Sequence, residues 1–288
     1  MKTYDVVSAF ITVRNEEQNI GETLKGLLSQ EYPLREIVVI NDGSTDRTGI
    51  ISQFHNDVYE KVIVVNLPYH ADSYVGRWEL GRIINHGLRK IRESGVPDFI
   101  LQMGGDHIIP NNYVSELLDR MTDKIRISSG TYEGAQLNIN TPIGSGKLID
   151  ARLWDKFNGM IYPEKYGFET WIDYRFRKEG YEVARHDDLM TECRPIKMSK
   201  KKAYYWGKCS YAQGGVLLFA LLKAFSLKGN GLNFLKGYCS RGDVEKHEDI
   251  YEYVGDMQYQ KAKRQIQSML RAKVITMKTS RWSEWLDD

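Results

Sequence analysis

The stretch SAFITVRNEEQNIGETLKGLLSQEYPLREIVVINDGSTDRT, residues 8–48, contains two apolar runs separated by a segment of helical spacing. The run over residues 6–13 is apolar at six of eight positions, and the run over 35–42 has four consecutive apolar residues at its centre. Between them, Ile20 and Leu24 recur at the interval of a helix face. Strands that are apolar on both faces and alternate with helices are typical of a parallel sheet covered by helices on both sides.

The alternation continues through the first half of the chain. The pattern predicts further helices over 45–56, 77–95, 111–122 and 168–180, and further strands over 61–67, 98–103, 125–132 and 181–186. From about residue 200 the sequence becomes aromatic, basic and helical. We therefore expect an α/β domain over residues 1–200 and a helical extension over 201–288.

Composition excludes several classes of protein. The 288 residues are 42% hydrophobic and 27% charged, which is ordinary for a soluble globular chain, and the net charge of +2 is too small to indicate a nucleic-acid partner. Cys193, Cys209 and Cys239 form no CxxC pair, and their odd number favours a reducing compartment over a disulfide framework. We expect neither a signal peptide in MKTYDVVSAFITV nor a spanning helix, since no apolar run approaches about 20 residues.

Three polar clusters follow strands of the expected sheet. They are TVRNEE (12–17), NDGSTD (41–46) and GGDHIIP (104–110). Each taken alone is also explained by a turn or a helix cap. Ligands of open α/β sheets bind outside the carboxyl ends of the strands, so three clusters at one edge together predict a ligand site.

Residues 8–48 resemble the amino-terminal half of a family 2 glycosyltransferase with the GT-A fold, which typically opens with an apolar strand, a short Asn-Glu segment and an EIIVVDDGSTDxT stretch. The resemblance extends from about residue 6 to residue 190. It implies a Rossmann-like mixed, mostly parallel sheet, a UDP- or GDP-sugar as donor, and transfer of the sugar to an acceptor hydroxyl with inversion. A cytoplasmic enzyme, at the inner face of the cell membrane if it binds lipid, would fit.

The resemblance assigns a nucleotide-sugar site residue by residue. Asp42 matches the carboxylate that accepts from the base, and Asn41 replaces an aspartate usually beside it; such charge-assisted bonds discriminate strongly. The other positions implied for the nucleotide are Thr12, Arg14 and Glu16 on the first loop and Arg82 and Asn85 on the helix before strand 98–103. The arginines could equally solvate a helix face.

The third cluster stands where the family has a DxD motif for a divalent metal. Gly104 takes the first aspartate position, Gly105 the spacer and Asp106 the second aspartate. One carboxylate can still hold Mn²⁺ or Mg²⁺ when phosphate oxygens and water complete the shell, and the glycines would let the backbone approach the donor. His107 and His186 are candidate further ligands, with a solvent-facing residue beside the site as the alternative for His107.

The catalytic base is expected in GFETWIDYRFRKEGY, residues 167–181, which ends like the family's RxxxxGY segment. Glu169 falls on the usual base and Phe168 replaces the acid before it; Asp173, one turn later, is the fallback. An acidic helix start that suits the helix dipole is the alternative. Gly146, in the glycine-rich stretch before this segment, would let the backbone pass close to the donor sugar.

Residues 197–238 mix lysines, aromatics and a short apolar helix. They fit contact with an anionic membrane surface, in line with the glycan or lipid-linked acceptors of the family, or a helix packed on the catalytic domain with its lysines in water. The oligomeric state stays open.

Two other functions remain open. A sugar-phosphate nucleotidyltransferase would carry a basic, glycine-rich loop after the first strand, where TVRNEEQNIG is acidic. A degenerate fold acting as a nucleotide or glycan binding module is favoured by Gly104 and Phe168, and opposed by Asp42, Asp106 and Glu169 together. No QxxRW segment of processive synthases occurs, so we expect one sugar per encounter.

Overall fold

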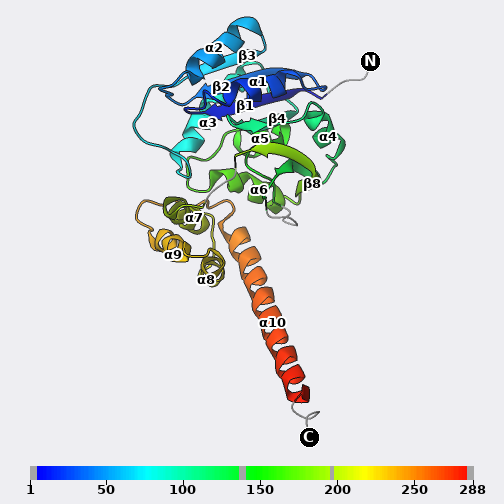
Figure 1. Cartoon of the computed structure of the whole chain (residues 1–288), viewed down its shortest axis with the longest axis vertical. Helices are drawn as coiled ribbons and strands as arrows, with labels where there is room; N and C mark the ends of the chain where they lie inside the picture. Colours follow the sequence, from blue (N-terminus) through cyan, green and yellow to red (C-terminus); the bar gives the residue numbers. More distant parts are fainter. Residues whose placement is uncertain (1–4, 136–140, 195–197, 284–288) are drawn as a thin grey trace. The chain divides into compact units, whose positions relative to one another are not determined.

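The computed structural model describes residues 5–135, 141–194 and 198–283, with side chains up to residue 268. The chain divides into two compact units, Met1–Lys197 and Met198–Asp288. The first unit contains β1 (Val7–Val13), α1 (Ile20–Leu28), β2 (Leu34–Asn41), α2 (Thr48–Val58), β3 (Val62–Asn66), α3 (Glu79–Glu93), β4 (Phe99–Gly104), β5 (His107–Ile108), α4 (Tyr113–Asp119), β6 (Ile125–Tyr132), β7 (Lys147–Asp150), α5 (Ala151–Asn158), α6 (Phe168–Lys178) and β8 (Glu182–Cys193). The second contains α7 (Lys200–Ala212), α8 (Leu217–Ser226), α9 (Gly231–Cys239) and α10 (Tyr251–Ser283) (Figure 1).

The first unit is built on a mixed sheet whose strand order is β3-β2-β1-β4-β7-β6-β8-β5. β1 pairs in parallel with β2 and β4, and β2 with β3, as the alternating pattern predicts. β7 then runs antiparallel to β4 and β6. The fold is therefore the expected GT-A type of mixed, mostly parallel sheet flanked by helices.

Both faces of the parallel half are covered because β1 and β2 are apolar on both. Val7, Ala9 and Ile11 lie in one core cluster with residues of α1 and α4. On the other face α3 packs so closely on β2 that a Cβ at Gly87 would lie 2.4 Å from Ile40 Cδ1. This burial fixes the strand ends, which carry the polar clusters.

Some boundaries differ from the sequence expectations. β7 and α5 occupy residues 147–158, for which we expected only a glycine-rich stretch, and β8 extends to Cys193 instead of ending near residue 186. Asp150 caps α5 by accepting from Leu153 N at 2.7 Å, a signal that its sequence context does contain.

The second unit has a small core of its own. Ala203 of α7, Ala220 of α8, and Phe234 and Tyr238 of α9 form a buried cluster. In Figure 1 these three short helices lie together, and α10 is a long single helix. No helix in the described part of the chain has the length and apolar character needed to cross a membrane.

Candidate active site

The carboxyl ends of β1, β2 and β4 lie side by side. Thr12 pairs with Ile40 of β2 on one side and with Gly104 of β4 on the other. Asp42 follows β2 directly and donates its backbone N–H to the carbonyl of Val13 at 2.9 Å. The register therefore brings all three polar clusters to one edge, as the sequence predicts.

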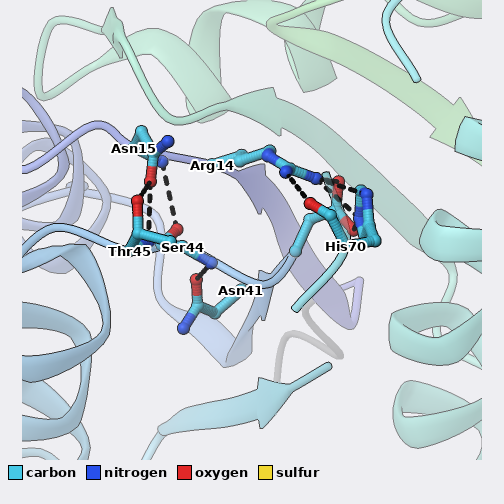
Figure 2. Close-up of polar contacts among 7 residues, drawn as sticks. Arg14, Asn15, Asn41, Ser44, Thr45 and His70 are labelled. Carbon is cyan, nitrogen blue, oxygen red and sulfur yellow. Dashed lines mark hydrogen bonds and ion pairs between the residues drawn. The ribbon is translucent and has the colours of Figure 1, made fainter. Parts of the chain in front are cut away.

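Asp42 is buried at this edge and shares its carboxylate with two cationic or polar partners. His70, from the loop after β3, has Nε2 2.8 Å from Asp42 Oδ1. Arg14 Nη1 lies 3.6 Å from Asp42 Oδ2. Figure 2 shows the Arg14 guanidinium beside His70. It is hydrogen-bonded to the ring and to the carbonyl oxygen of His70. The His70 ring stacks on Tyr74, with centroids 4.2 Å apart.

The first two loops are fastened to one another by side chain to backbone bonds. Asn15, at φ 53°, accepts from Thr45 N through Oδ1 at 2.9 Å, and its own N–H donates to Ser44 Oγ at 3.0 Å (Figure 2). Beside them, the buried hydroxyl of Thr12 has no hydrogen-bond partner within the residues that the structure describes. A buried polar atom without a partner is rare, and at a strand end it indicates a place for a ligand atom.

Asp106 does not stand alone. Arg194, which follows β8, donates Nε to Asp106 Oδ2 at 2.8 Å and Nη2 to Glu16 Oε1. Two carboxylates from loops 90 residues apart in sequence thus face one cationic group. Glu16, expected near the nucleoside, shares this arginine with Asp106.

The expected metal set of Asp106, His107 and His186 is not assembled. Across the described ranges no three His, Cys, Asp or Glu side chains are placed to share an ion. His107 is 1% exposed, so the solvent-facing alternative is also wrong, and its ring nitrogens lie 2.6 Å from Ser145 Oγ and 2.7 Å from Thr191 Oγ1. Burial lowers the pKa of His107 to about 4. His186 Nε2 lies 2.7 Å from Ser128 Oγ.

The residues present nevertheless suit a hard cation. Asp106 and Glu16 offer oxygen donors, and the Arg194 guanidinium between them is a positive stand-in group. Mg²⁺ and Mn²⁺ are commonly held by one or two carboxylates, with phosphate oxygens and water completing the shell. The pair Asp106 and Glu16 therefore fits such an ion better than the histidine set does.

Ser145 links this region to the start of α6. Its hydroxyl accepts from Gly104 N at 2.8 Å. On the preceding residue, a Cβ at Gly144 would lie 3.6 Å from Glu169 Oε1. Glu169 is exposed and lies in the first turn of α6. Its carboxylate lies beside the glycine-rich stretch of residues 144–146, which contacts Gly104 through Ser145.

Asp173 occupies a different environment from Glu169. It is buried, and its Oδ1 accepts from Lys147 Nζ at 2.9 Å; the side chains are 4% and 1% exposed respectively. Burial raises the pKa of Asp173, against the opposing effect of Lys147. Lys147 also donates to the backbone carbonyl of Glu169 at 3.4 Å. The Lys147–Asp173 pair thus fixes the start of α6. Because Asp173 is buried and paired, it is a poorer candidate for the base than Glu169.

Three residues expected at the donor have structural explanations. Asn85 is fully buried, and its amide exchanges hydrogen bonds of 2.9 and 2.8 Å with the backbone of Tyr162, which gives it a structural role; its contact with a nucleotide stays a prediction. A Cβ at Gly105 would lie 2.6 Å from Val13 Cγ2. Gly146 has φ 77°, and a Cβ at this position would lie 2.7 Å from Tyr113 Oη and 2.8 Å from His107 Cε1. Arg82 is exposed with its guanidinium 5.7 Å from the Trp78 ring centroid, and its role stays a prediction.

His70, Arg194 and Lys147 were missed by the sequence reasoning. His70 and Arg194 lie on segments without a motif, and only their long-range contacts bring them to Asp42 and Asp106. Lys147 gave a weak signal, since a lysine that begins an apolar strand needs a buried partner.

Comparisons with known proteins show which family the chain belongs to and which solved structures share its fold. The family model "Glycosyl transferase family 2" matches residues 8–171. The "Probable glycosyltransferase YdaM" of Bacillus subtilis is 39% identical over 74 residues, which are 25% of this chain and 18% of that protein. A hyaluronan synthase of Streptococcus pyogenes is 29% identical over 130 residues, 42% of this chain and 27% of the synthase. The match thus spans about a quarter or less of these relatives.

Solved structures share the fold at low identity. A mannosyltransferase from Pyrobaculum calidifontis, in complex with GDP-Man and Mn²⁺, superposes with a TM-score of 0.57 at 13% identity over 83% of this chain and 71% of its own. Glucosyl-3-phosphoglycerate synthase from Mycobacterium tuberculosis, with Mn²⁺, UDP and phosphoglyceric acid, gives 0.51 at 17% identity over 70% and 75%. Since the family model covers more than half of the sequence, the chain belongs to glycosyl transferase family 2.

Proposed function

We propose that the protein transfers a sugar from a UDP- or GDP-sugar to an acceptor hydroxyl, with inversion and with a divalent metal at the diphosphate. The observation that carries the proposal is a row of neighbouring residues along one sheet edge. It runs from Asp42, bonded to Val13, through Thr12 and Gly104 to Ser145, and Gly144 lies beside the Glu169 carboxylate. Base, diphosphate and acceptor would lie along it in that order.

The nucleoside end is supported by Asp42. Its buried carboxylate is held in place and accepts from an N–H of a planar ring, that of His70, which a uracil or guanine N–H would replace. The hydroxyl of Thr12 offers a further unused donor and acceptor nearby. Arg14 supplies positive charge at the same edge, where a diphosphate would be stabilised.

Asp106 and Glu16 would hold the metal, which when bound offsets the charge that develops on the leaving diphosphate. Both carboxylates contact Arg194 in the structure. Like charges repel at close range, so an ion could take this position only if the guanidinium of Arg194 moves away. Arg194 is 61% exposed, which leaves it room to do so.

Glu169 is the proposed base. Its carboxylate takes the proton of the acceptor hydroxyl while that oxygen bonds to the anomeric carbon, and the bond from this carbon to the diphosphate oxygen breaks on the opposite face. Asp173 and Lys147 act as positioning residues, because Lys147 bonds both Asp173 and the backbone of Glu169.

The acceptor is a glycan or a lipid-linked sugar in this proposal, and one sugar is transferred per encounter. We assign the reaction to the cytoplasm or the inner face of the membrane, a compartment in which the free Cys193, Cys209 and Cys239 would stay reduced.

A binding module without catalysis is the second candidate. The observation in its favour is Arg194, which neutralises the carboxylate that a metal would need. A nucleotidyltransferase has no comparable support, since the first loop carries Glu16 and Glu17 and no glycine-rich basic turn.

Thermal unfolding with UDP, GDP and their sugars, each with and without Mn²⁺, tests the proposal. An enzyme should be stabilised by one base type in a metal-dependent way, by about 2.7 kcal/mol at a ligand concentration one hundred times Kd. Slow release of nucleoside diphosphate from one donor should accompany it. Stabilisation without any release would favour the binding module, and no stabilisation by any nucleotide would overturn both.

A further inference from the structure

The second unit leaves large apolar side chains in solvent. Within the described residues, six of the fifteen exposed large apolar side chains fall between positions 206 and 232: Trp206, Leu217, Leu218, Leu221, Phe225 and Leu232. Phe225 is 89% exposed and Leu232 75%. Contiguous exposed apolar residues on a soluble unit indicate a surface that is covered by something else.

Four of these residues form a stripe along α8. Leu217, Leu218, Leu221 and Phe225 are spaced so that they fall within about 100° of the helix circumference. Ala220 is buried on the opposite side, in the core cluster with Phe234 of α9. The helix therefore contacts the core of the unit through a small residue and leaves four large apolar side chains exposed, which an isolated unit would not favour.

The charge around this stripe has one sign. Residues 198–239 contain no aspartate or glutamate, although the whole chain is nearly balanced with 40 basic and 38 acidic residues. The segment has seven lysines: Lys200, Lys201, Lys202, Lys208, Lys223, Lys228 and Lys236. Lys208 is buried against Asp243, whereas Lys200, Lys201, Lys228 and Lys236 are exposed.

Lysines also flank the exposed tryptophan. The ammonium groups of Lys202 and Lys223 lie 6.0 and 5.7 Å from the Trp206 ring centroid. Tryptophan beside lysine is the combination enriched where a protein meets the headgroup region of a bilayer, because the ring is amphipathic and the ammonium pairs with phosphate.

A second exposed stripe provides the contrast. Ile50, Phe54 and Val58 lie one turn apart on α2 and are all exposed. Residues 46–61 around them carry acidic and basic side chains together, including Asp57 and Lys61. Exposure of apolar residues is therefore shared by both helices, whereas the absence of acidic residues distinguishes α8 and its neighbours.

From these observations we propose that the outer face of α8, with Trp206 and Leu232, docks on an anionic lipid bilayer. The stripe enters the boundary between headgroups and acyl chains, and the lysines around it meet the lipid phosphates. The proposal concerns the second unit alone and does not depend on the proposed transferase reaction, since docking requires neither donor nor metal.

Vesicle flotation of the full chain tests this docking. Phosphatidylcholine vesicles containing phosphatidylglycerol should float the protein, whereas vesicles of phosphatidylcholine alone should float little of it. Phe225→Glu should lower the partition coefficient by at least about tenfold, because the buried area of the ring is lost and a repelled charge is added. Since Phe225 is exposed, the variant should unfold at the temperature of the wild type.

The matched control is Phe54→Glu, which places the same charge on the exposed stripe of α2 and should leave binding unchanged. Lys228→Glu and Lys236→Glu should each weaken binding to the anionic vesicles at least about fivefold per lysine, and added salt should weaken it further. Light scattering of the wild type and of Phe225→Glu gives the oligomeric state in parallel.

Three outcomes overturn the proposal. One is wild-type protein that does not bind anionic vesicles better than neutral ones. Another is binding that Phe54→Glu weakens as much as Phe225→Glu does. The third is a wild-type oligomer that Phe225→Glu dissociates while vesicle binding is absent, which would make the face an interface between copies of the chain.

Discussion

The two units depart from the usual distribution of side chains in opposite ways. The first buries both members of an ion pair, Lys147 and Asp173, at 1% and 4% side-chain exposure. The second leaves Phe225 and Leu232 in solvent above a core of four buried residues. Folding alone favours neither arrangement, because charge is costly to bury and apolar surface is costly to expose.

The comparison teaches where to look for function. In the first unit Lys147 of the buried pair donates to the backbone carbonyl of Glu169. The free-energy cost of burying the pair is therefore linked to the position of the Glu169 carboxylate. In the second unit the exposed stripe of α8 is not linked to a residue proposed for catalysis, and its exposure indicates an external partner. Substitutions in each unit should therefore have effects of different kinds, on catalysis and core stability in one and on surface binding in the other.

The largest expected effect is at Glu169. Glu169→Gln keeps the size of the side chain but removes the proton acceptor, so release of nucleoside diphosphate should fall by about 10²–10⁴-fold. Thermal unfolding should change little because Glu169 is exposed. Glu164→Gln, an exposed neighbour in the preceding loop, is the control and should retain activity. Retained activity in Glu169→Gln would remove the base from the proposal.

The next effect is on stability. Lys147→Met removes the partner of a buried carboxylate and should cost about 3–5 kcal/mol of unfolding free energy in urea. Lys147→Met with Asp173→Leu replaces the whole pair by apolar groups and should recover most of that loss.

The turnover of these variants distinguishes a positioning role of the Lys147–Asp173 pair from a purely structural one. If it positions Glu169, the recovered double variant should remain impaired in turnover although it is folded, with donor affinity little changed. Full activity in that variant would show that the pair is a structural feature only.

The parallel half of the fold is predictable from sequence because its strands are apolar on both faces and short polar segments separate them from helices. Residues 6–13 and 35–42 signal β1 and β2 without help from the rest of the chain. β7 is four residues long and begins with a lysine, so no local pattern identifies it; its place is decided by pairing with β4 and β6.

The candidate site divides in the same way. Asp42 and Asp106 follow strand ends and are visible as motifs, whereas Glu16 joins Asp106 only through Arg194, 88 residues further along the chain. Asn85 and Gly146 show the opposite case. The sequence suggests ligand contact for both, and the structure gives each a structural explanation as well, in buried backbone bonding and a positive φ.

A smaller effect should come from the core of the second unit. A Cβ at Gly207 of α7 would lie 2.0 Å from the carbonyl oxygen of Phe234 on α9. Gly207→Ala should force the helices apart and destabilise this unit by about 1–3 kcal/mol, seen as faster hydrogen exchange in α7 and α9. At Gly242 a Cβ would meet nothing within 4 Å, so Gly242→Ala should leave exchange unchanged. Equal exchange in both variants would contradict the packing of α7 on α9.

The smallest effect compares a thiol from each unit. Burial raises the pKa of the half-buried Cys193 from 9.0 to about 11, with a further contribution from the negative charge of Asp106, whereas Cys239 is exposed. A higher pKa leaves about 100-fold less thiolate at pH 8, but the remaining thiolate is the stronger nucleophile, which offsets about tenfold of the difference. Cys193 should therefore react with a disulfide reagent about tenfold more slowly than a thiol whose pKa is 9.0, and more slowly than the exposed Cys239.

The measurement uses two variants that each keep one of these thiols, Cys209→Ser with Cys239→Ser and Cys193→Ser with Cys209→Ser. The rate for Cys193 should keep rising with pH beyond 9, since its thiol is still mostly protonated there. If both thiols react at the same rate at pH 8, the end of β8 is more open to solvent than its contacts indicate.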